Sequence, residues 1–306
     1  MGNSSYDGII LIDKEEGKTS FEVVKAIRRL LKVKKVGHAG TLDPFATGLL
    51  IILLGQGTKL SNYLMAGEKA YEAIMRLGVE TDTQDLTGRV VNRCLVPEFE
   101  PTFIRKVALR FVGEIEQVPP LFSAVNYRGK RAYELARKGI KMDLQKRRVK
   151  VHSLAITSID LPDVTMKVTC SRGTYMRSLA ADLGKELGPG AHLKSLRRLC
   201  SGPFTVKDAL SLETVEHLSR NRLVPQSIIP LHEALPEMKQ AEVDSAMAQR
   251  IRNGHQPGCE EVAMVNLPRS FEGYMKLVDE KGLVAIAKVQ PLLENKASLK
   301  IMRVFN

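Results

Sequence analysis

The hydrophobic positions near the N-terminus predict two buried strands with an amphipathic helix between them. Residues 8–13 (GIILID) are apolar and β-branched, which is typical of a buried strand. Ser20 is expected to cap a helix. The apolar stripe of that helix consists of Phe21, Val24, Ile27, Leu30 and Leu31. A loop punctuated by glycines covers residues 37–48, and the apolar run 49–54 again has the length of a strand.

The pattern further along the chain mixes helices and strands. Thr58 is expected to cap a short helix, residues 69–77 alternate as a strand, and TDTQDLTG (81–88) has the composition of a turn. Helices are predicted near 102–111, 130–138 and 174–187, and strands at 121–126, 148–159 and 163–170. This alternation predicts an α/β fold.

Three prolines, at positions 225, 230 and 236, mark a change of composition and a domain boundary. We therefore expect one domain over residues 1–236 and a second over 237–306. The second has a helix near 242–252, a hairpin formed by 276–279 and 283–289, and a last strand at 299–305. This pattern predicts a small β-barrel module.

Composition excludes several classes of protein. The chain has 306 residues, of which 44% are hydrophobic, yet no run reaches the roughly 18–20 apolar residues of a membrane-spanning helix. The N-terminal residues lack the pattern of a secretory signal. The four cysteines have no zinc-site spacing, and the histidines form no metal-binding motif. We expect free thiols, a cytoplasmic location and no bound metal.

The charge balance points to a polyanionic partner. Lys and Arg total 46 against 34 acidic residues, a net charge of +12. Basic residues follow one face of the first helix, over 25–35, and gather again in a segment at about 125–150. We interpret this second segment as a protruding, RNA-facing element. The alternatives are a lysine-rich soluble surface for the whole chain and a solvated helix face for the segment.

The loop at 37–48 is the strongest candidate for a site of chemistry. Its glycines allow the backbone to approach a ligand closely, and Pro44 keeps Asp43 in an extended conformation. An ionisable group on a rigid loop between packed elements is typical of catalysis. The loop matches neither the Walker pattern nor G-x-G-x-x-G. Taken alone, however, Asp43 would be a turn residue and His38 a hydrogen-bonded loop histidine.

The string GHAGTLDPFATGLL, at 37–50, closely resembles the signature of the TruB family, the tRNA pseudouridine-55 synthases. Further similar segments occur in the expected order: DKEEGKTS at 13–20, PPLFSA at 119–124, GKRAYELAR at 129–137, CSRGTYMR at 170–177, and GAHL at 190–193 with the residues up to 199. The C-terminal segment resembles a PUA module, which binds RNA. Glu15 and Asn126 depart from the family pattern, where Pro and Lys are common, but both lie outside the nucleophile loop.

The resemblance implies an enzyme that flips a uridine out of the tRNA T stem-loop and isomerises it without a cofactor. Asp43 would be the attacking carboxylate, and Arg177 would pair with it and keep it charged. Tyr71 would pack against the flipped base and remove the proton from its C5 atom. Without the resemblance, Arg177 would be a surface helix residue and Tyr71 a plain core aromatic.

The same resemblance assigns four further residues to substrate binding. His38 would fill the space left by the flipped uridine, Tyr175 and Leu196 would line the pocket, and Lys14 would support the loop or touch a phosphate. A solvated lysine at a strand end is the alternative for Lys14.

For the fold, the resemblance implies an α/β architecture of the α+β type. Its mixed, mainly antiparallel sheet is flanked by helices and has a catalytic cleft that holds Asp43. A monomer without an obligatory protein partner is expected, because the compact chain lacks long basic tails. Two alternatives stay open. One is a synthase that depends on a guide RNA or acts on ribosomal RNA, and the other is an RNA-binding or tRNA-folding protein without catalysis.

Overall fold

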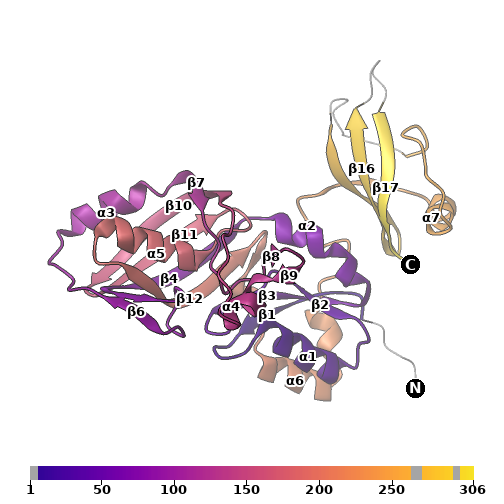
Figure 1. Cartoon of the computed structure of the whole chain (residues 1–306). Helices are drawn as coiled ribbons and strands as arrows, with labels where there is room; N and C mark the ends of the chain where they lie inside the picture. Colours follow the sequence, from indigo (N-terminus) through magenta and orange to yellow (C-terminus); the bar gives the residue numbers. More distant parts are fainter. Residues whose placement is uncertain (1–5, 263–270, 292–296) are drawn as a thin grey trace.

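A computed structural model describes residues 6–262, 271–291 and 297–306, and its main body is built on a nine-stranded mixed sheet (Figure 1). The main path of the sheet runs β1 (Gly8–Lys14), β3 (Thr47–Leu54), β12 (Ala191–Ser201), β4 (Lys69–Leu77), β11 (Asp163–Cys170), β10 (Arg147–Asp160) and β7 (Gly113–Gln117). In addition, β2 (Val36–Ala39) pairs with β3, and β13 (Phe204–Thr205) pairs with β12. Among the described strands of this sheet, β3 and β12 are the one pair that runs parallel, and the expected mixed, mainly antiparallel sheet is confirmed.

Strands β1 and β3 are buried on both faces, which explains why their sequences are continuously apolar. Ile10 and Ile12 point into one core, which helices α1 (Ser20–Leu31) and α5 (Met176–Leu187) share. Ile9 and Leu11 point into a second core on the opposite face. The sheet is therefore a central layer at this end of the molecule.

The first helix starts one residue earlier than expected. Thr19, not Ser20, is the N-cap, and it forms a capping box with Glu22. The Ser20 hydroxyl is instead buried against the loop that carries Asp43. The apolar stripe is confirmed in part, but Phe21 is 57% exposed. Successive residues of an α-helix are rotated by about 100°, so a residue at the edge of the apolar stripe, such as Phe21, can face the solvent.

The remaining helices of the body are α2 (Ser61–Ala66), α3 (Pro101–Leu109), α4 (Ala132–Arg137) and α6 (Leu212–Arg220), with short 3₁₀ turns η1 (Gly55–Leu60), η2 (Val206–Asp208) and η3 (Val224–Ser227). In Figure 1, α3 and α5 lie over the β4–β11–β10 half of the sheet, and α1 and α6 lie side by side at the other half.

Two local predictions are wrong. Thr58 does not cap a helix, because it lies inside η1 and its hydroxyl donates to the Gly55 carbonyl. The strand predicted at 121–126 is irregular, and only β8 (Asn126–Tyr127) pairs there, with β9 (Lys130–Arg131). The helix predicted near 130–138 is confirmed as α4, which starts after this hairpin and is slightly shorter.

Sequence patterns also missed β12, the central strand between β3 and β4. Its sequence, AHLKSLRRLCS, carries four basic side chains and does not alternate cleanly. A second omission is the small hairpin of β5 (Val79–Thr81) and β6 (Val90–Arg93). These strands exist because neighbouring strands pair with them, a tertiary effect that outweighs local propensity.

The C-terminal segment forms a separate four-stranded sheet of β14 (Lys239–Glu242), β15 (Gly273–Asp279), β16 (Gly282–Pro291) and β17 (Ala297–Val304), with helix α7 (Ser245–Arg252). The hairpin of β15 and β16 and the last strand are confirmed. Leu283, Ile286 and Phe305 pack into the second core of the main body. In the described residues the pairings leave β14 and β17 as edges, which is an open sheet. No described helix has the length and apolar character needed to cross a membrane.

Candidate active site

The loop that carries Asp43 is fixed on both sides of this residue. On one side, the Ser20 hydroxyl accepts a hydrogen bond from the Leu42 amide (2.9 Å) and donates to the Leu42 carbonyl (3.1 Å). On the other side, Lys14 Nζ donates to the Pro44 carbonyl at 3.1 Å. These contacts hold the Asp43 backbone in one place, as a preorganised site requires.

Lys14 lies beneath this loop and is only 1% exposed, so a solvated lysine at a strand end is the wrong interpretation. Its ammonium group also donates to the carbonyl groups of Glu15 (2.9 Å) and Lys18 (2.6 Å). Burial lowers the pKa of Lys14 to about 8, although the nearby Asp43 raises it. These three bonds all go to backbone carbonyl groups, which favours the supporting role over contact with a phosphate.

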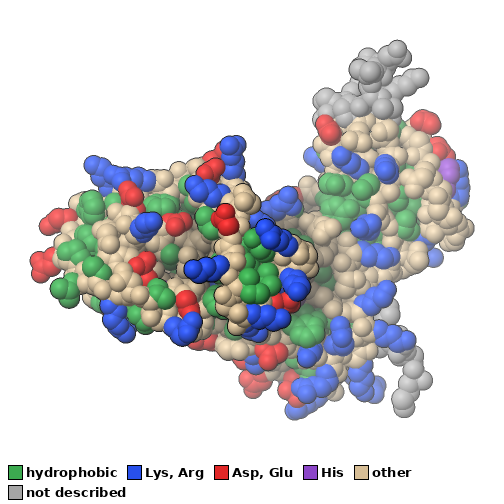
Figure 2. Space-filling model, viewed as in Figure 1, with side chains coloured by type: hydrophobic (Ala, Val, Ile, Leu, Met, Phe, Trp, Pro, Cys, Tyr) green, Lys and Arg blue, Asp and Glu red, His purple; other side chains and the backbone are tan. Residues whose placement is uncertain are grey.

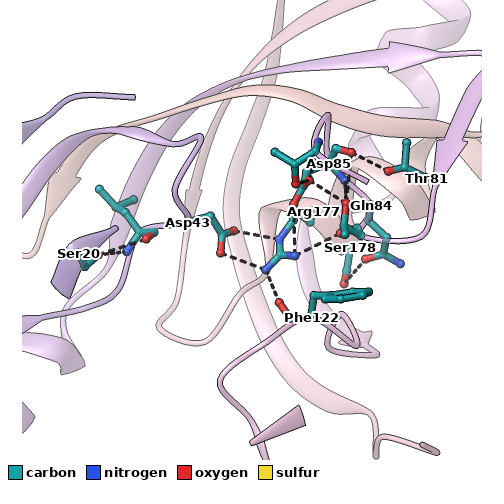
Figure 3. A network of polar contacts seen from close by, with 11 residues as sticks. Ser20, Asp43, Thr81, Gln84, Asp85, Phe122, Arg177 and Ser178 are labelled. Atoms are coloured by element: carbon teal, nitrogen blue, oxygen red, sulfur yellow. Dashed lines mark hydrogen bonds and ion pairs between the residues drawn. The ribbon is translucent and has the colours of Figure 1, made fainter. Parts of the chain in front are cut away.

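Asp43 and Arg177 form a bidentate ion pair, although they lie 134 residues apart in the sequence (Figure 3). Arg177 Nε lies 2.9 Å from Asp43 Oδ2, and Nη2 donates to Oδ1 at 3.1 Å. The Arg177 side chain is 5% exposed, whereas that of Asp43 is 33% exposed. Arg177 is therefore not a surface residue. Its fork orients the carboxylate while leaving part of it open to a ligand.

The Arg177 guanidinium also contacts groups other than Asp43. Nη1 lies 3.4 Å from Asp85 Oδ2 and donates to the Thr83 carbonyl, and Nη2 donates to the Phe122 carbonyl. Asp85 in turn accepts bonds from the Thr83 hydroxyl and from the amide and hydroxyl of Thr87. Sequence reasoning missed Asp85 and took its segment only for a turn. The only feature of the sequence that could have indicated Asp85 is the high content of Asp and Thr in TDTQDLTG.

The pKa of Asp43 depends on burial and on three neighbouring charges. Burial raises it, Arg177 lowers it, Asp85 raises it, and Lys14 lowers it. The net direction is upward, because burial, with a smaller contribution from Asp85, outweighs the lowering by Arg177 and Lys14. Asp43 is therefore more easily protonated than an ordinary aspartate, and Arg177 is the main group that keeps it ionised.

Tyr71 lies on β4, opposite Val168 of β11 and Arg198 of β12. Burial raises the pKa of its hydroxyl, and the charge of Arg198 opposes this effect. Asp43 also raises the pKa of Tyr71, as the smallest of the contributing charges. Leu196, two residues before Arg198, is 6% exposed and belongs to the main core.

The two other predicted binding residues lie on different elements. Tyr175 is the N-cap of α5, and the buried side chain of Gln117 bonds to both its amide and its carbonyl. His38 lies on β2, opposite Ile52, and burial lowers its pKa, which favours the neutral ring. Among the described residues, no hydrogen bond or ion pair joins His38, Tyr175 or Leu196 to Asp43.

Basic side chains cover the surface around this site. Figure 2 shows Lys and Arg side chains on the face where β8, β9 and α4 lie. All ten basic residues of the 128–150 segment are exposed: Arg128, Lys130, Arg131, Arg137, Lys138, Lys141, Lys146, Arg147, Arg148 and Lys150. The basic residues of α1 are exposed too. A surface of this kind suits a polyanion. No group of described residues could hold a metal ion.

Comparison with known proteins identifies the class to which this fold and site belong. The description "TruB family pseudouridylate synthase (N terminal domain)" matches residues 28–176, and "tRNA pseudouridylate synthase B C-terminal domain" matches residues 177–236. The tRNA pseudouridine synthase B of Geobacter sulfurreducens is 42% identical over 98% of this chain and 100% of its own length. That of Syntrophus aciditrophicus is 41% identical over 98% and 99%. The protein is thus a pseudouridine synthase, an isomerase. It belongs to the TruB family.

Solved structures agree with this assignment. A chain in the crystal structure of a Cbf5–Nop10–Gar1 complex superimposes with a TM-score of 0.77 at 26% identity, over 98% of this chain and 85% of that one. A chain in an H/ACA RNP bound to a substrate RNA containing 2′-deoxyuridine gives a TM-score of 0.74 at 25% identity, over 98% and 85%.

Proposed function

We propose that this enzyme converts uridine 55 in the T loop of tRNA into pseudouridine, with Asp43 as the attacking carboxylate. The observation that carries the proposal is the bidentate pair of Asp43 with the buried Arg177. A carboxylate that is oriented, ionised and one-third exposed can meet a nucleoside, and few structural roles require all three properties. The near full-length similarity to tRNA pseudouridine synthases supports tRNA as the substrate.

The reaction breaks the bond between ribose C1′ and base N1 and forms a bond between C1′ and C5. C5 loses one proton and N1 gains one, so the formula and oxidation state are unchanged and the balance requires no redox cofactor. Asp43 attacks the ribose or the base and is released at the end. Tyr71 packs against the base and removes the C5 proton.

The target base is stacked inside an RNA loop and must be flipped into the site. His38 fills the space that the base leaves, and Tyr175 and Leu196 line the pocket. The neutral state favoured for His38 suits stacking among bases, because an uncharged ring costs less to desolvate. The exposed basic residues of α1 and of the 128–150 segment grip the phosphate backbone.

We further infer that residues 1–236 form the catalytic domain and residues 237–306 a PUA-like RNA-binding module. The enzyme is expected to act in the cytoplasm as a monomer without an obligatory protein partner. The Cbf5 chains in the comparison come from assemblies with further proteins, which favours a guide-dependent synthase as the second candidate. Their identity of about 26% is well below the 41–42% shared with the tRNA enzymes.

The test is tritium release from [5-³H]uridine in a T-arm transcript, measured for wild type and for Asp43→Asn. Wild type should release tritium unaided, while Asp43→Asn should release none and still bind the RNA. Asp163→Asn, an aspartate paired with Arg76 and Lys194 away from the site, is the control. Turnover only with a guide RNA and partner proteins would favour the second candidate, and no turnover on any RNA would leave a non-catalytic RNA-binding protein.

A further inference from the structure

Arg198 is a buried cation that forms no ion pair with any carboxylate in the described part of the chain. It lies on β12 between its neighbours Gly48 on β3 and Tyr71 on β4, and it is 1% exposed. The adjacent Arg197 forms a bidentate pair with Asp13, but no ion pair involves Arg198 among the residues that the structure describes. Burying an unpaired charge is costly, so a role beyond packing is expected for it.

The Arg198 guanidinium connects three parts of the active site. Nε donates to the Leu49 carbonyl at 2.7 Å, and Nη2 donates to the Gly40 carbonyl at 3.0 Å. These carbonyl groups lie on either side of Asp43 in the sequence. Tyr71 is the residue directly opposite Arg198 in the pairing of β4 with β12, and the Arg198 charge lowers the pKa of its hydroxyl. One rigid planar group therefore bonds to both ends of the catalytic loop and lies beside the proposed base.

The backbone is shaped for this arrangement. A Cβ atom on Gly48 would lie 2.3 Å from the carbonyl oxygen of Arg198, so only glycine lets β3 approach β12 this closely. Gly48 also has a φ of +96°, which disfavours any other residue. The glycine that ends the catalytic loop thus brings the loop within reach of Arg198.

We propose that Arg198 is a positioning residue that holds the Tyr71 hydroxyl in fixed relation to the Asp43 loop and stabilises the form of Tyr71 that accepts a proton. This inference rests on the proposed function, in which Tyr71 takes the C5 proton. Because a guanidinium only donates, the Tyr71 oxygen can meet it only as an acceptor. The charge also favours the phenolate over the phenol.

The other charges that face Tyr71 act in the opposite direction. Burial, Cys170 on β11 and Asp43 all raise the pKa of Tyr71, whereas the neighbouring Arg198 lowers it. Arg198 is thus the group that stabilises a phenolate at Tyr71, whereas burial and the other neighbouring groups disfavour it. Its removal should raise the pKa of Tyr71.

The direct test replaces Tyr71 by 3,5-difluorotyrosine in the full chain and titrates it by fluorine NMR. Arg198→Met should raise the pKa of this residue by about one unit or more, the scale of a lost charged hydrogen bond. Arg198→Lys keeps the charge and should give a smaller rise. Arg197→Met, on the same strand but paired with Asp13, is the matched control and should leave the titration unchanged.

Single-turnover rates provide the second test. Both Arg198 variants should lower the single-turnover rate by about 10²-fold, the lower end of what positioned proton transfer contributes, with unchanged RNA affinity. In a Tyr71→Phe background, Arg198→Met should cost much less, because the two residues act together. An unshifted titration in folded Arg198→Lys and Arg198→Met, or fully additive losses, would overturn the proposal. The titration needs no RNA, so it remains decisive even if the proposed function fails.

Discussion

Replacing Arg177 by lysine tests the central ion pair with little change of charge. The guanidinium makes two contacts with Asp43, one with Asp85, and one each with the Thr83 and Phe122 carbonyl groups. An ammonium group has three donors on one nitrogen, so it cannot hold two separated carboxylates and two carbonyl groups together. Arg177→Lys should therefore keep the positive charge and lose the orientation of Asp43.

The size of the effect follows from the contacts that are lost. At least one of the two contacts with Asp43 disappears, and a hydrogen bond to a charged group, such as the one from Nη2 to Asp43, contributes about 1.5–3 kcal/mol. Since Asp43 is one-third exposed, solvent reduces this value, and we take about 2 kcal/mol. About 1.4 kcal/mol corresponds to a factor of ten, so the single-turnover rate should fall roughly 30-fold or more.

The assay is single-turnover tritium release at saturating enzyme, with RNA affinity measured separately by filter binding. Arg76→Lys is a matched control, because Arg76 makes the same bidentate contact with Asp163 at the far side of the sheet. It should leave the rate unchanged. A rate for Arg177→Lys within about threefold of wild type would contradict the idea that the fork orients the carboxylate, since such a change is below 1 kcal/mol.

Three further outcomes are expected. Because the pKa of Asp43 is raised, the rate should fall as pH decreases through a value above that of an ordinary aspartate, with a slope of one proton; a rate that is flat down to pH 4 would refute this. Asp85→Asn removes a charge that raises the pKa of Asp43, so its acid limb should move to lower pH, while the looser hold on Arg177 should reduce the plateau rate by about tenfold. Lys14→Met leaves three backbone carbonyl groups without their donor and should lower the free energy of unfolding by about 2 kcal/mol in denaturant titrations, whereas Lys25→Met on the exposed face of α1 should not.

The predictions that succeeded describe elements with a strong local pattern. The strands at 8–13, 69–77, 148–159 and 163–170 were found because their apolar residues recur at the spacing of a strand or run continuously. The helices at 102–111 and 174–187 show the longer helical period. Strand β12 was missed because its arginines have partners elsewhere in the fold, the Asp13 carboxylate for Arg197 and backbone carbonyl groups for Arg198, which no local pattern reveals.

The sequence by itself determined the family, the loop with Asp43 and the abundance of basic residues, because each of these is a string or a count that can be read along the chain. Which buried charged side chains lie in contact could be determined only from the tertiary structure. Arg177 reaches Asp43 and Asp85 from a distant helix, and Arg198 is buried between Tyr71 and the loop. A buried charge is stabilised by whatever surrounds it in space, and that environment exists only after the strands have paired.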